Sequence, residues 1–249
     1  MRFSANTGFL WPELAFPDRI RAAAAAGFAA VEFHDEAQAL DPAALTALFD
    51  ETGLAVCGLN VRMGPTAGCA AIPGAEAQAR ADIDAAIRVA DLVGAGAIHV
   101  LSGKTDAPDA AATLMAALRY ALDRTERLIL IEPICRAAMP GYFLHDLDQA
   151  IGLLARVDHP RLKLLFDCFH IETEHGDCLA RFRSVAPLVG HVQIASVPGR
   201  IEPDAGALDY RFLLPEMRDC GYAGAFGCEY RPRAGTDAGL AWMNDLRPL

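Results

Sequence analysis

Short apolar runs alternate along the chain with longer segments that mix apolar and polar residues. The runs start near residues 2, 30, 55, 97, 128, 162, 191 and 224. Runs of this kind, rich in Val, Ile and Leu, are typical of strands buried on both faces of a parallel sheet. The longer segments between them carry helix signals. The pattern therefore predicts eight strands, each followed by a helix.

The helix signals are clearest where a capping residue, a proline and a glycine follow one another in the expected order. Asp41 and Pro42 predict the start of a helix that ends at Gly53. Pro17 predicts the start of an earlier helix through the alanine-rich residues 22–26. Further helices are predicted over residues 75–93, 109–125, 147–156, 178–185, 212–220 and 237–245.

Regular alternation of strand and helix over about 250 residues is typical of a (β/α)8 TIM barrel. An open doubly wound sheet is the alternative, but it usually has a glycine-rich phosphate turn after its first strand. Residues 6–9, Asn-Thr-Gly-Phe, do not form such a turn. No break in composition marks a second domain. The sequence therefore predicts a single TIM-barrel domain over residues 1–249.

Composition narrows the classes of protein to which the chain can belong. Hydrophobic residues make up 53% of the 249 residues, which predicts a large core and argues against disorder. The net charge of −10 argues against non-specific binding to nucleic acid or to an anionic membrane. No window is apolar for long enough to cross a bilayer, and residues 1–6 do not begin a signal peptide.

The seven cysteines predict reduced thiols rather than a disulfide framework. Their number is odd, no Cys-x-x-Cys occurs, and their spacing does not match a zinc site. Reduced thiols are typical of the cytosol, so we expect a cytoplasmic enzyme. The sequence leaves the oligomeric state open, a homo-oligomer included.

A polar side chain occurs at or near the end of each of the last four predicted strands. These side chains are Glu132, Asp167, Gln193 and Glu229. In a TIM barrel such strand ends meet at one mouth, where reactive residues lie. Three carboxylates this close repel one another unless a cation neutralises them, and oxygen ligands suit Mg²⁺ or Mn²⁺ better than zinc. A divalent metal site is one interpretation, and separate strand-end polar groups or helix caps are the other.

Segments through nearly the whole chain match those of a known family in order and spacing. They are residues 2–6, 27–28, 31–33, 103–105, 130–134, 167–170, 190–195, 199–203, 227–230 and 239–243. On these segments the chain resembles the hydroxypyruvate isomerases, in the sugar-isomerase-like barrel superfamily that also includes xylose isomerase and apurinic endonucleases. The resemblance implies that Glu132, Asp167, Gln193 and Glu229 bind a divalent metal. It also implies that Glu132 and Glu229 act as the proton donor and acceptor.

The implied activity is an aldose–ketose type isomerisation of a small hydroxy-oxo acid. Its substrate would be hydroxypyruvate, converted to tartronate semialdehyde, or a four-carbon analogue such as 2-oxo-tetronate. A metal that chelates a hydroxyl and the adjacent carbonyl acidifies the C–H bond between them and stabilises an enediolate. Two carboxylates on opposite sides of the substrate can then take the proton from one carbon and return it to the next.

Five further residues are candidates for substrate binding. His170 lies just beyond the end of a strand and matches the spacing of a substrate-contacting histidine in related ketose epimerases. Arg200 suits a substrate carboxylate through a two-pronged ion pair, and Glu202 lies in the same family-matching segment. Lys104 could add positive charge near an acid, and Asn60 matches a family asparagine. Ordinary surface, loop or turn roles are the alternatives for these residues.

The sequence also departs from the pattern that we expect of a hydroxypyruvate isomerase. The loop over residues 61–74 is short and lacks a tryptophan. His34 and Asp35 after the second strand differ from the expected residues, and Phe169 replaces a tyrosine. Because these positions are expected to line the mouth of the barrel, they leave the identity of the substrate open.

Three other functions compete with an isomerase. A ketose 3-epimerase could use the same metal and the same two glutamates. A DNA-repair nuclease of the superfamily would need a histidine-rich site with several zinc ions and a basic groove, whereas this chain is acidic and has seven scattered histidines. A non-catalytic sugar-acid binding barrel would not need two opposed proton carriers, and this chain retains both.

Overall fold

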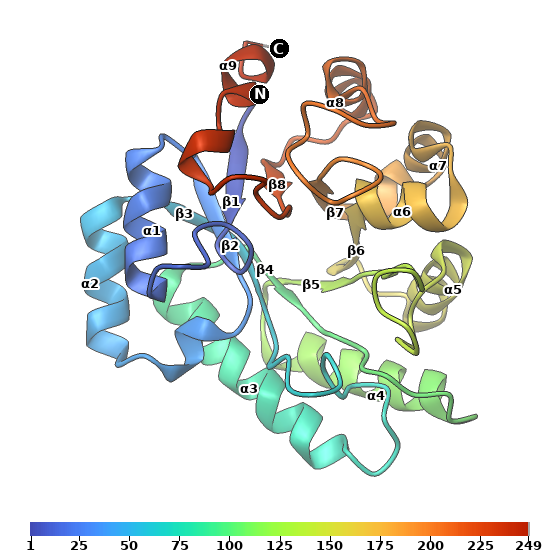
Figure 1. The fold of residues 1–249 in the computed structure, drawn as a ribbon. Helices are drawn as coiled ribbons and strands as arrows, with labels where there is room; N and C mark the ends of the chain where they lie inside the picture. Colours follow the sequence, from blue (N-terminus) through green and yellow to red (C-terminus); the bar gives the residue numbers. More distant parts are fainter. Residues whose placement is uncertain (249) are drawn as a thin grey trace.

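The strands pair in chain order, and the last pairs with the first, so that the sheet closes into a barrel (Figure 1). The computed structural model describes residues 1–248, and every strand pair in it is parallel. The strands are β1 (Phe3–Asn6), β2 (Ala30–Phe33), β3 (Ala55–Asn60), β4 (Ala97–His99), β5 (Leu128–Ile131), β6 (Leu162–Asp167), β7 (Val189–Ile194) and β8 (Phe226–Cys228). The predicted TIM barrel is confirmed.

Helices surround the barrel on its outside, as Figure 1 shows. The α-helices are α1 (Phe16–Ala25), α2 (Pro42–Thr52), α3 (Glu76–Val93), α4 (Ala110–Arg124), α5 (Leu147–Val157), α6 (Cys168–His175), α7 (Cys178–Val185), α8 (Tyr210–Asp219) and α9 (Trp242–Leu246). Short 3-10 helices are η1 (Glu36–Ala39), η2 (Ala186–Leu188) and η3 (Asp237–Gly239). The predicted helices are present with bounds that shift by a few residues, except that the one predicted over residues 237–245 is divided into η3 and α9. Helix α6 is an addition that the sequence analysis did not predict.

Local sequence explains where two of these helices begin. The side chain of Asp41 accepts hydrogen bonds from the backbone N–H groups of Ala43 and Ala44, both at 3.0 Å, and caps α2. Gly53 ends that helix in the left-handed conformation, at φ 63°. Asp167, the last residue of β6, caps α6 in the same way by accepting from the N–H of Phe169 at 2.8 Å. Helix α6 therefore starts directly at a strand end.

The buried apolar side chains form two separate clusters. Most buried apolar side chains form one large cluster, whereas Ala97, Leu130 and Leu165 form a small separate cluster on β4, β5 and β6. This second cluster borders a small void of about 20 Å³ that Glu32 and His191 also line. The inside of the barrel therefore mixes apolar residues with a buried carboxylate and a buried imidazole.

The first residues of the chain and helix α9 lie together beside the seam between β1 and β8 (Figure 1). Trp242 of α9 packs edge-on against Phe3 of β1, with ring centroids 5.0 Å apart. Its indole N–H donates to the Tyr230 hydroxyl at 3.2 Å, and the Met1 ammonium donates to the carbonyl of Arg247. Among the described residues, the helices are all too short or too polar to traverse a bilayer.

Candidate active site

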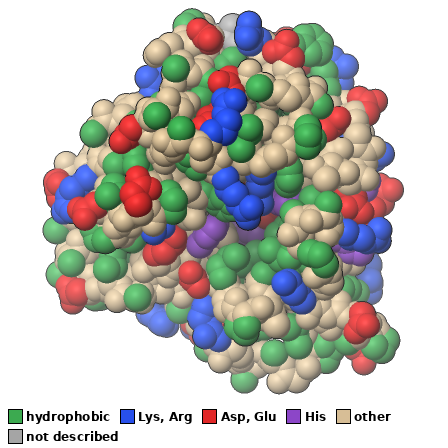
Figure 2. Space-filling model, in the orientation of Figure 1, with side chains coloured by type: hydrophobic (Ala, Val, Ile, Leu, Met, Phe, Trp, Pro, Cys, Tyr) green, Lys and Arg blue, Asp and Glu red, His purple; other side chains and the backbone are tan. Residues whose placement is uncertain are grey.

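A cavity of about 400 Å³ opens at the carboxyl ends of the strands. Figure 2 shows histidine side chains in a hollow near the centre of this face, beside basic side chains. The polar and charged side chains that line the cavity are His34, Asn60, His99, Glu132, His170, Gln193, Arg200, Glu229 and Arg231. Three of the four residues predicted from strand ends, Glu132, Gln193 and Glu229, therefore share the cavity with several basic groups, whereas Asp167 does not line it.

The four predicted metal ligands all lie at this end of the barrel and are almost fully buried. Glu132 follows β5 directly, Asp167 ends β6, Gln193 lies one residue before the end of β7, and Glu229 follows β8. Their exposed fractions are 4%, 1%, 4% and 8% respectively. Burying three carboxylates so completely is unfavourable unless positive charge or hydrogen bonds balance them.

Arg200 supplies positive charge to two of these carboxylates. One guanidinium nitrogen, Nη2, donates to Asp167 Oδ2 at 2.9 Å and to Glu229 Oε1 at 2.6 Å. The guanidinium also lies over the rings of Phe9 and Phe169, 4.8 and 5.1 Å from their centroids. Arg200 is thus held in place from several sides, while its buried Nε has no hydrogen-bond partner among the described residues.

The ionisation of the two glutamates differs strongly from that of exposed carboxyl groups. Burial, together with the charges of Glu229 and Asp167, raises the pKa of Glu132 well above its ordinary value, although Arg200 acts in the opposite direction. Burial raises the pKa of Glu229 to about 8, again against the effect of Arg200. A cation bound beside these carboxylates would lower both pKa values, because it favours the ionised form.

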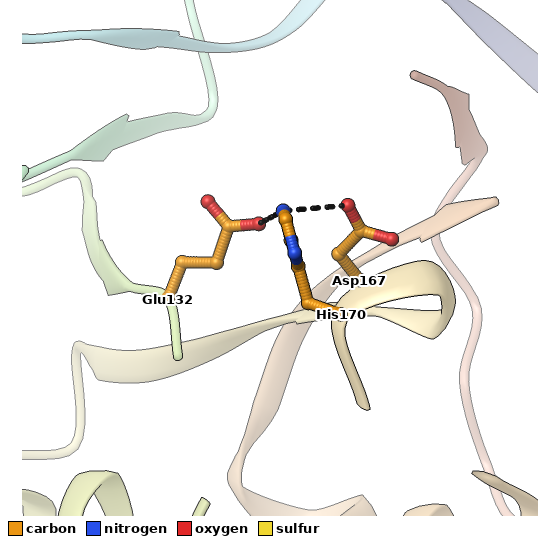
Figure 3. A group of neighbouring side chains, drawn as sticks. All are labelled: Glu132, Asp167 and His170. Carbon is orange, nitrogen blue, oxygen red and sulfur yellow. Dashed lines mark ion pairs between the residues drawn. The ribbon is translucent and has the colours of Figure 1, made fainter. Parts of the chain in front are cut away.

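His170 of α6 lies between two of the carboxylates (Figure 3). Its Nε2 is 3.7 Å from Glu132 Oε1 and 3.5 Å from Asp167 Oδ2. Its Nδ1 accepts from the backbone N–H of Cys135 at 3.4 Å, and burial lowers the pKa of His170 to about 4. A neutral ring with Nδ1 engaged as an acceptor carries its proton on Nε2, where it faces the carboxylates.

The residues present fit a divalent cation. Glu132, Asp167 and His170 each place one ligand atom within 4.8 Å of the others. Within the described residues, Oε1 of Glu132 and Oε1 of Gln193 are buried without a hydrogen-bond partner. Unpaired buried oxygens are costly, and a bound cation would satisfy them. The cluster could therefore hold a metal ion, whose identity these residues do not specify.

Gln193 is held by a residue that the sequence analysis did not single out as functional. Its Nε2 donates to Glu32 Oε1 at 2.8 Å, and Glu32 also accepts from Ser4, Asn6 and His191. Burial alone would raise the pKa of Glu32, but the charge of His191 and these hydrogen bonds lower it overall. Glu32 is therefore an ionised carboxylate inside the barrel.

Three of the five predicted substrate-binding residues, His170, Arg200 and Asn60, line the cavity. Lys104 and Glu202 do not line it. Lys104 is exposed, and Glu202 is buried in an ion pair with Arg233, whose Nε lies 2.8 Å from Glu202 Oε2. We therefore leave Lys104 and Glu202 out of the proposed substrate site.

The cavity also contains residues that the sequence analysis did not assign to the site. His99 ends β4, is 3% exposed, and has no hydrogen-bond partner for Nε2 in the described part of the chain. Its position at a strand end was the same signal that identified Glu132. Phe9 and Arg231 carried no such signal, because loops bring them to the cavity. His34 and Phe169, two of the departures from the family pattern, also line it.

Comparisons with known proteins agree with the TIM-barrel fold and identify the family. A family model described as the xylose isomerase-like TIM barrel matches residues 20–246. The chain is 41% identical to the 2-oxo-tetronate isomerase of Cupriavidus necator, over 97% of each chain. It is 36% identical to the hydroxypyruvate isomerase of Escherichia coli, over 99% of this chain and 100% of that relative.

A solved structure is similar over the whole fold. The crystal structure described as an AP endonuclease, family 2, from Brucella melitensis matches with a TM-score of 0.93 and 35% identity, over 98% of each chain. The resemblance to the hydroxypyruvate isomerases is thus confirmed over nearly the whole chain. The chain is therefore an enzyme of the xylose isomerase-like TIM barrel family, related along its length to the hydroxypyruvate and 2-oxo-tetronate isomerases.

Proposed function

We propose that this enzyme is a divalent-metal-dependent isomerase of a small hydroxy-oxo acid. Its substrate is hydroxypyruvate, interconverted with tartronate semialdehyde, or a close analogue such as 2-oxo-tetronate. The observation that carries the proposal is the group of three buried carboxylates and one amide at the ends of four neighbouring strands. The names of the two relatives that match the full chain support the substrate class.

Glu132, Asp167, Gln193 and Glu229 are the proposed ligands of the cation, with Mg²⁺ or Mn²⁺ suited to this oxygen-rich set. When bound, the cation supplies a positive charge that acidifies the C–H bond next to the substrate carbonyl. The alternative ligand set replaces Gln193 with His170. The contact between Nδ1 of His170 and the N–H of Cys135 argues against that set, because it favours a proton on Nε2, the nitrogen that faces the carboxylates.

Glu132 and Glu229 are the proposed proton carriers. One carboxylate takes a proton from the hydroxymethyl carbon of hydroxypyruvate, and the electron pair left behind forms an enediolate. The other glutamate returns a proton to the adjacent carbon, and a hydroxyl proton moves between the two oxygens. Both carboxyl groups line the cavity, where they would reach a small acid bound there, and this supports the role.

Arg200 is the proposed partner of the substrate carboxylate. A guanidinium has five N–H donors, and Nη2 alone makes the contacts with Asp167 and Glu229. Arg200 lines the cavity, and the N–H groups of its Nη1, which these two contacts do not use, remain for an acid there. Asn60 and the neutral His170 are the proposed hydrogen-bonding partners of the substrate oxygens.

A small acid fits this site better than a nucleic acid does. The chain carries a net charge of −10, and the reactive groups lie in a cavity of about 400 Å³ rather than along an open groove. A volume of this size is typical of a small-molecule site.

The function can be tested by NMR in D₂O with Mg²⁺ or Mn²⁺ and a panel of three- and four-carbon hydroxy-oxo acids. We expect deuterium to enter the substrate at carbon while ketone and aldehyde interconvert. Glu132→Gln and Glu229→Gln are expected to abolish both exchange and conversion, while Lys104→Gln, outside the cavity, leaves them unchanged. Inversion at one carbon without aldehyde would instead identify a 3-epimerase, and binding without exchange would identify a sugar-acid binding barrel.

A further inference from the structure

Gln193 can bind the proposed cation only if the oxygen of its side-chain amide, and not the nitrogen, faces the cation. An amide has a donor end and an acceptor end of nearly equal size, and rotation of the group exchanges them. Only the oxygen end can bind a cation. Some neighbouring group must therefore fix the rotation of the Gln193 side chain.

Glu32 is the group in contact with the donor end. Both oxygens of Glu32 already act as acceptors, Oε1 from Asn6 and Oε2 from Ser4, so the nitrogen of Gln193 faces Glu32 Oε1, 2.8 Å away. The opposite rotation would place two oxygens against each other inside the barrel. Oε1 of Gln193 is consequently turned away from Glu32, buried and without a hydrogen-bond partner among the described residues.

Glu32 is itself fixed by hydrogen bonds from several strands. Ser4 Oγ donates to Oε2 at 3.1 Å, Asn6 Nδ2 donates to Oε1 at 3.2 Å, and His191 Nε2 contacts Oε2. Ser4 and Asn6 belong to β1, and His191 belongs to β7. The carboxylate therefore has little freedom to rotate away from Gln193.

A glycine lets the two side chains meet across the barrel. Gly227 of β8 pairs with Ser4 of β1 and with Gln193 of β7. A Cβ atom at Gly227 would lie 2.6 Å from each carboxylate oxygen of Glu32 and 2.9 Å from Cγ of Gln193. Any side chain at this position would separate Glu32 from Gln193, so the small residue is needed for their contact.

We propose that Glu32 is a positioning residue that orients the Gln193 amide so that Oε1 faces the divalent cation. The inference rests on the metal site proposed above and adds a residue that does not itself contact the cation or substrate. Groups that orient a metal ligand in this way typically change metal affinity by about 10- to 100-fold when they are removed. Glu32 does not line the cavity, and it contacts the nitrogen end of the Gln193 amide rather than the oxygen end.

The experiment measures the Kd of Mn²⁺ for the purified, metal-free protein from the EPR signal of free Mn²⁺. Glu32→Met removes the acceptor at similar length, and Glu32→Asp keeps a carboxylate but draws it back by one methylene. Both are expected to raise the Kd by about tenfold or more. Glu32→Gln is the conservative variant, because its carbonyl can still accept from Gln193, although its amide no longer excludes the opposite rotation. It is expected to raise the Kd less than Glu32→Met does.

Two further variants separate positioning from a general structural effect. Asp41→Ala removes the hydrogen bonds that cap α2, which does not reach the cavity, and is expected to leave the Kd unchanged. Gln193→Leu is expected to weaken Mn²⁺ binding, and adding Glu32→Met to it is expected to weaken binding no further. This non-additivity follows if Glu32 acts only through Gln193.

The outcomes distinguish the inference from the proposed function. Wild-type affinity in both Glu32→Met and Glu32→Asp, with weakened binding in Gln193→Leu, would refute the positioning role and leave the metal site standing. If Glu32→Met does not fold, Glu32→Asp decides the question alone. Failure of the wild-type protein to bind Mn²⁺, or wild-type affinity in Gln193→Leu, would instead overturn the proposed metal site, and the inference with it.

Discussion

At the scale of single residues, Asp167 links the fold directly to the candidate site. Its Oδ1 accepts from the backbone of Phe169 at 2.8 Å, and its Oδ2 accepts from Arg200 at 2.9 Å. The first bond fixes the orientation of the carboxylate, and the second places a guanidinium beside it. The position of Arg200 in the cavity is therefore a consequence of how α6 begins.

Arg200 provides a prediction at this scale. Arg200→Lys keeps the charge but removes the planar donor group, so we expect KM for a hydroxy-oxo acid to rise about tenfold. Steady-state kinetics with hydroxypyruvate checks this result. Arg233→Lys is the matched control, because Arg233 pairs with Glu202 and Asp204 away from the cavity. An unchanged KM in Arg200→Lys would contradict the proposed contact.

The sequence identified single residues well where they lie at strand ends. Glu132, Gln193 and Glu229 follow this rule, and all three line the cavity. The contacts of Arg200 could not be predicted, because it comes from the loop after β7 and pairs with residues from β6 and β8. The charged contact between Glu32 and His191 was also missed, since the inside of a barrel is usually apolar.

At the scale of elements, the start of α6 gives a prediction that separates structure from charge. Asp167→Asn can still accept from the N–H of Phe169, whereas Asp167→Ala cannot. We therefore expect Asp167→Ala to be less stable than Asp167→Asn by about 1 kcal/mol, as is usual for a lost helix cap. Urea denaturation of the metal-free proteins measures the difference.

The cap of α2 supplies the control for this comparison. Asp41→Ala is expected to cost about 1 kcal/mol of unfolding free energy, because it removes two hydrogen bonds from backbone N–H groups. It should not change Mn²⁺ affinity, since α2 does not reach the cavity. Equal stability of Asp167→Asn and Asp167→Ala would show that the cap does not determine the start of α6.

A helix could be predicted from the sequence where its start and end are marked by residues within or next to the helix itself. Asp41, Pro42 and Gly53 predicted α2 with nearly its observed bounds, because capping involves neighbours in the sequence. Helix α6 was missed because it has no linker before it and only a weakly amphipathic sequence. For its cap, Asp167, the sequence predicts a metal ligand or a helix cap, and the structure shows the cap.

At the scale of the whole molecule, closure of the barrel depends on packing between the two ends of the chain. Trp242 is 3% exposed and packs against Phe3 of β1, beside the seam with β8. Trp242→Ala should lower the free energy of unfolding by about 3–5 kcal/mol, since it leaves a large cavity in the core. Chemical denaturation tests this expectation.

An exposed aromatic residue offers the matched control for this substitution. Phe212 of α8 is 57% exposed, so Phe212→Ala is expected to change stability by no more than about 0.5 kcal/mol. Similar losses in the two variants would contradict the view that α9 stabilises the barrel seam. The alternation of strands and helices predicted the barrel itself, but not this contact between residues far apart in the chain.

The central claim is that oxygen atoms from four separate strands converge on one cation at the mouth of the barrel. The most direct test is a crystal structure after soaking in Mn²⁺, with the anomalous signal used to locate the ion. We predict one strong peak within about 2.0–2.4 Å of oxygens from Glu132, Asp167, Gln193 and Glu229. A vacant site, or a peak bound by His170 with Gln193 remote from it, would contradict the account.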